Sequence, residues 1–346
     1  MIILTDRQTD RQTDRQTDQI EWINVTKGVA MLMVIWGHVS LSDNIVLLWF
    51  TKFHVPTFLI LTGLLFAKTS KKLSGCKKTI RKTVIPYLTF SLFAMITDGI
   101  LNYRMGYAVR VIIVDLYKTI TLYGIHALWY LGSYMIAVCV FLVVNERTCR
   151  IVRYALYLLF LLNAIVCTKL VDEKSLLIVL PIVSLIRACA CVSIIGIGYE
   201  LYSFFYKIGC HRKLNLIIAT MFLMTSFALS LISGESNFSV LDFGEYPIVS
   251  LAASILGAIG MPLLVQAINK HWHFVAWLGK NSLILLITHS SLKLTVLSQE
   301  IWRHFRWIND LNFGLLCLIT VIIMEIPLIN LLNGKLNFLI SGKMNT

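Results

Sequence analysis

The sequence predicts an all-α, polytopic integral membrane protein of about ten transmembrane helices, with both termini in the cytoplasm. Of its 346 residues, 57% are apolar and 14% are charged, and the mean hydropathy is +0.76. Apolar runs of about 17 to 25 residues recur along the chain, and each is long enough to cross roughly 30 Å of hydrocarbon as a helix. These observations exclude a water-soluble domain, so the polar residues are interpreted with the bilayer as solvent.

Three regions divide the chain. Residues 1–20 contain a tandem TDRQ repeat, which buries no apolar surface and is predicted to be a disordered tail; alternatively, it precedes the true start of the protein. Residues 21–333 form the membrane domain, and residues 334–346 form a cytoplasmic tail. Within the domain, helices are predicted near 22–40, 45–67, 84–101, 127–145, 154–170, 175–206, 214–233, 248–268, 281–298 and 312–333.

Two segments differ from a simple span. The run 175–206 is too long for one crossing, and Arg187 in its middle is predicted to lie at a kink or to face a polar cavity. Segment 102–126 contains RVIIVDLYKTI, an amphipathic stretch expected at the membrane interface.

The distribution of Lys and Arg predicts the orientation. Seventeen lie on the side that receives segments 68–83 and 146–153, and six lie on the other side, which receives segment 234–247. By the positive-inside rule, the side with seventeen is cytoplasmic and holds both termini.

Charge and cysteine content argue against two classes of site. The net charge is +13, but the basic residues lie between apolar runs and not on one polar face, so no nucleic-acid binding is predicted. The eight cysteines are scattered without C-x-x-C spacing. They are predicted to be reduced packing residues, and no metal site is predicted.

Polar residues within the first two spans are the main candidates for function. Ten residues separate Lys27 from His38, which places them on nearly one helix face, roughly 16 Å apart. Such a pair suits a path from a cytosolic donor to an external acceptor; alternatively, Lys27 extends to the interface and His38 caps the helix. In the second span, Pro56 is expected either to open the helix so that His54 meets His38, or to produce an ordinary kink.

Further candidates follow along the chain. Residues 68–87 carry seven basic residues and no acidic one, which suits anionic lipid head groups or the phosphates of a donor such as coenzyme A. No Gly-rich phosphate loop is present. In LGKNSLILLITHSSLKL, Asn281 and Ser282 suit a helix start, and His289 lies two turns further on. Trp129 is either an interfacial anchor or part of a site, and His289 is either a packing residue or part of a site.

Taken in order, these segments resemble the integral membrane acyltransferase 3 family, especially its branch resembling fucose 4-O-acetylases. The resemblance covers roughly residues 21–333. Its matching features are Lys27-Gly28 to Gly37-His38, Phe53-His54-x-Pro56-x-Phe58 with Thr62-Gly63, Arg81-Lys82 before Pro86-Tyr87, Leu128-Trp129-Tyr130-Leu131, Gly196-x-Gly198-Tyr199, and Leu278-Gly279-Lys280-Asn281-Ser282 through His289. Three positions depart from the family: Asn24 where Asp is common, Thr62 where Ser is usual, and Lys27 where many relatives have Arg, whose bidentate contacts Lys cannot make.

The resemblance implies transfer of an acyl group, usually acetyl from cytoplasmic acetyl-CoA, to a carbohydrate hydroxyl at or beyond the outer face of the bacterial inner membrane. Its implied partners are acyl-CoA, a glycan or glycolipid acceptor and membrane lipids, with no bound cofactor. By position, His38 is the catalytic base or transient acyl acceptor, and Lys27 binds the donor or stabilises charge. The predicted substrate- or donor-binding residues are His54, Arg81, Lys82, Trp129, Arg187, Asn281 and His289.

Three alternatives remain open. Ten spans with buried His, Lys and Arg also suit a transporter or flippase of a lipid-linked sugar, although no pair of matching interrupted helices is evident in the two halves. The second alternative is a family member that has lost catalysis, although the retained His38 argues against it. Succinyl or another short acyl group is the third.

Overall fold

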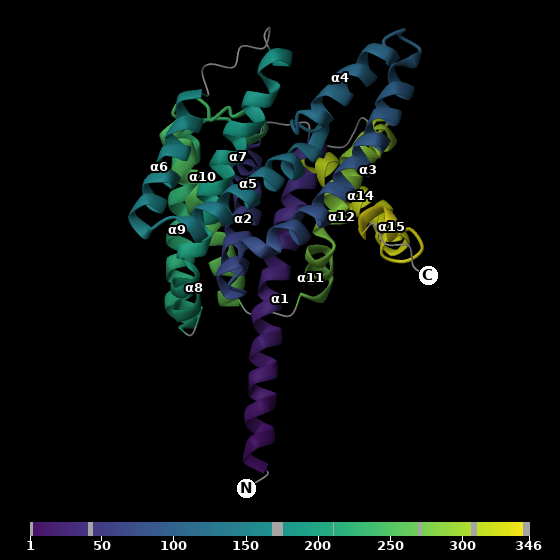
Figure 1. The fold of residues 1–346 in the computed structure, drawn as a ribbon. Helices are drawn as coiled ribbons and strands as arrows, with labels where there is room; N and C mark the ends of the chain where they lie inside the picture. The colour runs from purple at the N-terminus through teal and green to yellow at the C-terminus, as the bar shows by residue number, and fades with distance from the viewer. Residues whose placement is uncertain are drawn as a thin grey trace.

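The protein is a bundle of α-helices in the computed structural model (Figure 1). The structure describes residues 3–40, 44–167, 176–209, 211–268, 272–305 and 310–341, except for the side chains of residues 3–20, 176 and 177. No strand is present in these ranges. The predicted all-α class is therefore confirmed. Helix α1 begins at Ile3, within the segment predicted to be a disordered tail; the side chains of residues 3–20 lie outside the described ones, and the division of the chain into a domain and two tails stays a prediction.

The helices follow one another with short connections. They are α1 (Ile3–Val39), α2 (Ile45–Lys68), α3 (Cys76–Tyr103), α4 (Ala108–Ile120), α5 (Trp129–Arg147), α6 (Arg150–Cys167), α7 (Leu176–Glu200), α8 (Tyr202–Gly209), α9 (Arg212–Ser233), α10 (Pro247–Ile268), α11 (His273–Lys280), α12 (Ser282–Ser291), α13 (Leu294–Arg303), α14 (Asp310–Asn333) and α15 (Phe338–Ser341). Short 3-10 helices occupy Leu73–Gly75, His126–Leu128 and Phe238–Val240.

Eight helical segments in the described residues are long and apolar enough to cross a membrane, compared with the ten predicted. They contain α2, α3, α5, α6, α7, α9, α10 and α14. The predicted span 22–40 lies in α1, which runs through the middle of the bundle (Figure 1). Because neighbouring helices enclose α1, it carries polar residues such as Lys27 and His38 that a lipid-facing helix would not tolerate.

The other missing span is a broken helix. Residues 281–298 divide into α12 and α13 at Lys293, whose φ of 57° is left-handed and ends α12. The long run 175–206 also divides, but at Leu201, between α7 and α8. Helix α7 is continuous through Arg187, so the long run does not divide at this residue, and the kink expected there stays a prediction.

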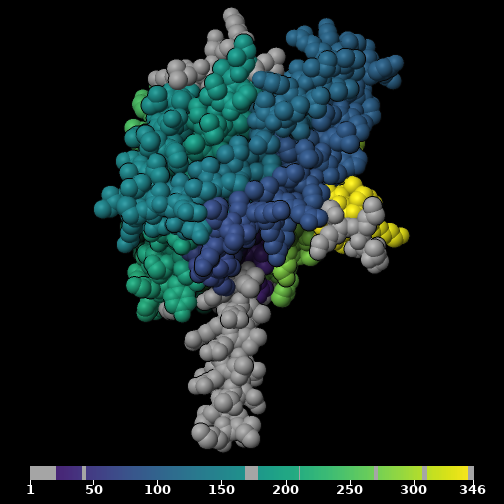
Figure 2. Space-filling view, viewed as in Figure 1, coloured from purple at the N-terminus to yellow at the C-terminus, as the bar shows by residue number. Residues whose placement is uncertain are grey.

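The amphipathic segment is the helix α4, as predicted. Its apolar side chains, among them Val109, Ile113 and Ile120, are exposed, whereas Asp115 and Thr119 are buried against the bundle. Together α3 and α4 form a lobe that protrudes at one side of the molecule (Figure 2). Exposed apolar residues beside buried polar ones suit contact with lipid and not with water.

Close helix crossings at glycines fix the centre of the bundle. A Cβ on Gly279 of α11 would overlap the main chain of Asn24, and a Cβ on Gly28 of α1 would overlap the main chain of Val275. Likewise, Gly63 of α2 and Gly198 of α7 each face the main chain of the other helix. Small residues at such crossings let two backbones touch, so these glycines set the positions of α1 and α2.

Candidate active site

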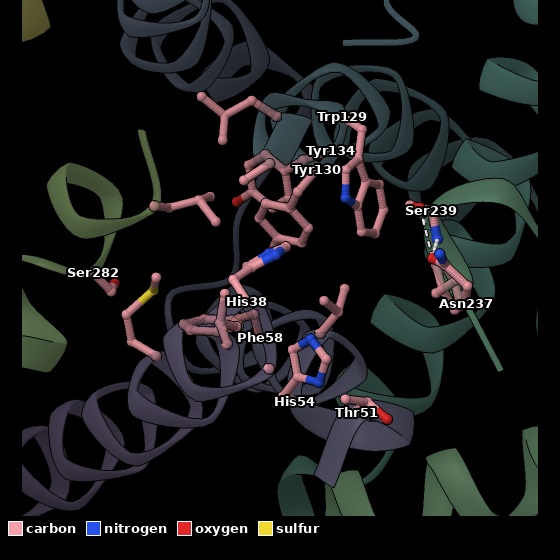
Figure 3. Close-up of a pocket in the computed structure, with 18 of the residues that line it drawn as sticks. His38, Thr51, His54, Phe58, Trp129, Tyr130, Tyr134, Asn237, Ser239 and Ser282 are labelled. Carbon is pink, nitrogen blue, oxygen red and sulfur yellow. Dashed lines mark hydrogen bonds between the residues drawn. The ribbon is translucent and has the colours of Figure 1, made fainter. Parts of the chain in front are cut away.

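One cavity of about 830 Å³ lies among α1, α2, α3, α5, α12 and the connection between α9 and α10. We call this connection, residues 234–246, the α9–α10 loop. The volume is typical of small-molecule sites, which measure about 300–1,000 Å³. Figure 3 shows His38 and His54 facing this space, with Trp129, Tyr130 and Tyr134 opposite them and Asn237 and Ser239 at one side.

The cavity has two chemically different ends. Lys27 and Lys82 line one end, and Glu235 and Asp242 line the other. His38 lies between them, because it follows Lys27 by three turns, roughly 16 Å, of α1. The cavity thus joins the basic side, predicted to be cytoplasmic, to the acidic α9–α10 loop on the predicted outer side.

His38 has no hydrogen-bond partner within the described residues, and its exposed side chain lines the cavity. Its ring centre is 5.3 Å from that of His289. His289 is fully buried, and its Nδ1 lies 2.6 Å from the carbonyl oxygen of Leu285. A carbonyl only accepts, so Nδ1 carries the proton and Nε2 has a free lone pair. That buried Nε2 has no partner, which leaves it available to a proton donor nearby.

His54 lines the same cavity from α2. Its Nδ1 donates to the carbonyl oxygen of Phe50 at 3.0 Å, so Nε2 is unprotonated in the neutral ring. Helix α2 continues through Pro56, so the proline does not interrupt the helix that carries His54.

The predicted cations take different places. Lys27 is half-buried on the cavity wall and has no ion-pair partner among the described residues. Lys82 lines the cavity and is exposed. Arg81 is exposed beside it but does not line the cavity.

Three predicted residues lie behind the cavity wall. His289 is buried behind His38, with the two ring centres 5.3 Å apart. Arg187 is fully buried and donates to Ser133 Oγ at 2.6 Å and to the carbonyl oxygen of Tyr123 at 2.7 Å. Asn281 is the N-cap residue of α12, as the sequence indicated, and its Oδ1 accepts from Asn333 Nδ2 at 2.7 Å. The structure therefore gives Arg187 and Asn281 contacts within the protein.

Aromatic rings and the α9–α10 loop complete the wall. Tyr130 stacks on Tyr134 with ring centres 5.8 Å apart, and Trp129 stacks on Phe238 at 6.1 Å. The sequence analysis named Trp129 but neither tyrosine as a site residue, and it treated the loop only as a connection. The signal available for the loop was its composition: three acidic residues and no Lys or Arg in 234–246.

No group of three or more His, Cys, Asp or Glu side chains within the described ranges is arranged to hold a metal ion. The seven cysteines in these ranges are free thiols; Cys210 lies outside them. The residues present suit acid–base chemistry on a bound organic substrate.

Comparison with known families gives one match. Residues 20–328 match a family model whose description is an acyltransferase domain. The comparison with curated proteins finds no match, and neither does the comparison with solved structures.

Proposed function

The chain belongs to the acyltransferase 3 family of membrane proteins, and from this premise we propose that it is an O-acyltransferase of the bacterial inner membrane. It moves an acetyl or similar short acyl group from cytoplasmic acyl-CoA to a hydroxyl of a glycan or glycolipid. One observation carries the proposal: a single cavity joins a basic end to an acidic end and has His38 and His54 between them. The branch resembling fucose 4-O-acetylases stays a prediction, because the match concerns the domain as a whole.

The basic end suits the donor. Lys27 and Lys82 supply positive charge for the phosphates of coenzyme A. Between these lysines and His38, apolar side chains of Met31, Val34 and Leu286 line the cavity. Such a lining accommodates the uncharged arm of the donor and leads its thioester toward His38.

His38 suits the role of general base. Its neutral imidazole takes the proton of an acceptor hydroxyl while the oxygen attacks the thioester carbonyl carbon. The carbon–sulfur bond then breaks, and the departing thiolate takes the proton back from the imidazolium, so the ester and free coenzyme A are formed. In an alternative, the acyl group passes first to the His38 ring and then to the hydroxyl.

His289 suits the role of a positioning residue for His38. The ring centres lie 5.3 Å apart, and a modest rotation of the His38 ring would bring one of its nitrogens to the unpartnered Nε2 of His289. Because His289 Nε2 has a free lone pair, it accepts only from a protonated nitrogen of His38. The second nitrogen of His38 is then unprotonated and faces the cavity as a base.

The experiment compares glycan O-acetylation in cells that express the intact protein, His38→Ala or His304→Ala at equal membrane abundance. His304 is an exposed histidine that does not line the cavity, so it serves as the matched control. Cells are fed labelled acetate, and glycans are analysed by mass spectrometry. Label is expected with the intact protein and with His304→Ala and is lost with His38→Ala.

Other outcomes separate the alternatives. Equal label with His38→Ala would reject His38 as the base but keep the enzyme class. If the intact protein adds no label in a host that makes its native glycan, the transporter of a lipid-linked sugar is favoured. The continuous cavity is the observation that keeps this second candidate open.

A further inference from the structure

We propose that the α9–α10 loop recognises the acceptor and selects a neutral polyhydroxylated molecule over an anionic one. We also propose that two buried cations, Arg187 and Lys52, are positioning residues for this loop. The inference rests on the proposed function, because it assigns the acceptor to the acidic end of the same cavity.

The loop presents hydrogen-bond acceptors to the cavity. Glu235 and Asp242 both line it, and the Glu235 carboxylate has no hydrogen-bond or ion-pair partner among the described residues. Asp242 uses Oδ1 to accept from the main-chain N–H of Gly244 at 2.9 Å and also interacts electrostatically with the buried Lys52, while its Oδ2 has no hydrogen-bond partner among the described residues. Carboxylate oxygens accept hydrogen bonds from hydroxyl groups and repel anions. The end of the cavity therefore favours a neutral saccharide over a uronic acid or a phosphorylated sugar.

Arg187 holds this loop from α7. It is 0% exposed, and it donates from Nη1 to the carbonyl oxygen of Ser239 in the loop at 2.5 Å. Its guanidinium also lies 4.9 Å from the ring centre of Trp129, which lines the cavity. No carboxylate pairs with Arg187 among the described residues. A buried charge in a membrane protein is costly, and here its contacts join the loop to the aromatic wall.

Lys52 holds the same loop from α2. It is 2% exposed, and its Nζ donates to Ser236 Oγ in the loop at 3.3 Å and to Ser250 Oγ at 3.1 Å. Two buried cations from different helices thus meet one short loop. Neither lines the cavity, so their role is to position residues that do.

The loop also has a fixed shape of its own. The main-chain N–H of Asp242 donates to the carbonyl oxygen of Asn237 at 3.0 Å, and Asn237 Oδ1 accepts from Ser239 Oγ at 2.6 Å. Leu241 is fully buried and left-handed, with φ of 59°. A recognition element that is ordered before binding loses less entropy when the ligand arrives.

The first experiment measures sugar binding to the purified full-length protein in lipid nanodiscs without acyl donor. The probes are methyl glycosides of neutral hexoses and 6-deoxyhexoses, with methyl glucuronide as the anionic probe, and saturation-transfer NMR reports affinity. The intact protein is expected to bind a neutral glycoside about 10-fold more tightly than the glucuronide.

Two substitutions that remove the carboxylate charges of the loop test whether these charges cause the selectivity. Glu235→Gln and Asp242→Asn keep the shape of each side chain, and the amide introduced by the second substitution keeps an oxygen for the Gly244 N–H. Together they are expected to bring the neutral-to-anionic affinity ratio close to one. Glu245→Gln removes an exposed loop carboxylate outside the cavity lining and should leave the ratio unchanged. A ratio near one in the intact protein, no binding of any glycoside, or an unchanged ratio in the double variant would each overturn the assignment.

The positioning role has its own test. Arg187→Lys keeps the positive charge, but a lysine ammonium cannot reproduce the set of hydrogen bonds that the planar guanidinium donates to its partners. It should weaken neutral glycoside binding several-fold while the affinity for radiolabelled acetyl-CoA is unchanged. Parallel loss of both affinities would indicate general misfolding and reject a local role, as would unchanged glycoside binding.

The binding tests need no turnover, so they are separable from the proposed function. Labelled glycan in cells, combined with an unchanged affinity ratio in the double variant, rejects the loop assignment and keeps the enzyme. Selective glycoside binding without any acyl transfer rejects the enzyme and keeps the loop.

Discussion

Replacing Gly279 by alanine tests whether the α1–α11 crossing holds the active site together. The new Cβ would overlap the carbonyl oxygen of Asn24 and lie 2.8 Å from the main-chain nitrogen of Gly28. Overpacking costs about 1–3 kcal/mol where side chains can adjust. Here the obstacle is main chain, so we expect about 3 kcal/mol. Alanine recovers up to about 1 kcal/mol of helix propensity, so the expected net loss is about 2 kcal/mol.

The assay is thermal unfolding of purified protein in detergent, followed by intrinsic tryptophan fluorescence. Gly279→Ala should lower the midpoint by several degrees. Gly37→Ala is the control in the partner helix α1, because its Cβ would meet only Thr51 Cγ2 at an ordinary 3.5 Å. The control should melt at or above the temperature of the intact protein. If Gly279→Ala melts there as well, the two backbones do not touch as described.

Three further predictions concern catalysis. His289→Ala should lower kcat about 10- to 100-fold with little change in KM, and His289→Gln, whose amide oxygen accepts a hydrogen bond, should recover part of the loss. Lys27→Met should raise the KM for acetyl-CoA about 10-fold, whereas Lys27→Arg should retain donor binding or improve it. Lys82→Ala should raise that KM more than Arg81→Ala, because only Lys82 lines the cavity. Steady-state kinetics with a glycoside acceptor measures all three, and the opposite order for the last pair would move the donor site outside the cavity.

The apolar runs predicted most helices, because hydrophobic length is what a membrane selects. The predicted span 45–67 matches α2 (Ile45–Lys68), and 248–268 matches α10 (Pro247–Ile268). Helix α11 was missed because its eight residues are too few to cross the bilayer. The break at Lys293 was missed because it depends on a single left-handed residue, which hydropathy does not reveal.

Lys27, His38 and His54, which the position of polar residues in the first two spans made candidates, line one cavity, and their roles stay predictions. Helical spacing did not separate residues on the cavity wall from residues behind it. Arg187 was a reasonable binding candidate, because a charge within a span is costly. Only the three-dimensional contacts show that its donors are directed to Ser133, Tyr123 and Ser239. Contacts between distant segments are not encoded in local periodicity.

The order of weak motifs along the chain has a physical explanation in these contacts. Lys27 is next to Gly28, His54 precedes Gly63 on the same helix, and Gly279 leads into Ser282, which lines the cavity. Lys27, His54 and Ser282 thus each lie within about three helical turns of a glycine at a backbone crossing, whereas Gly37, beside His38, meets only a side chain at an ordinary contact distance. Two helices that touch at a glycine have little freedom to slide past each other. The crossing therefore fixes the position of the polar residue nearby. The three crossing glycines therefore fix the helices that carry Lys27 and His54, although none of the three lines the cavity.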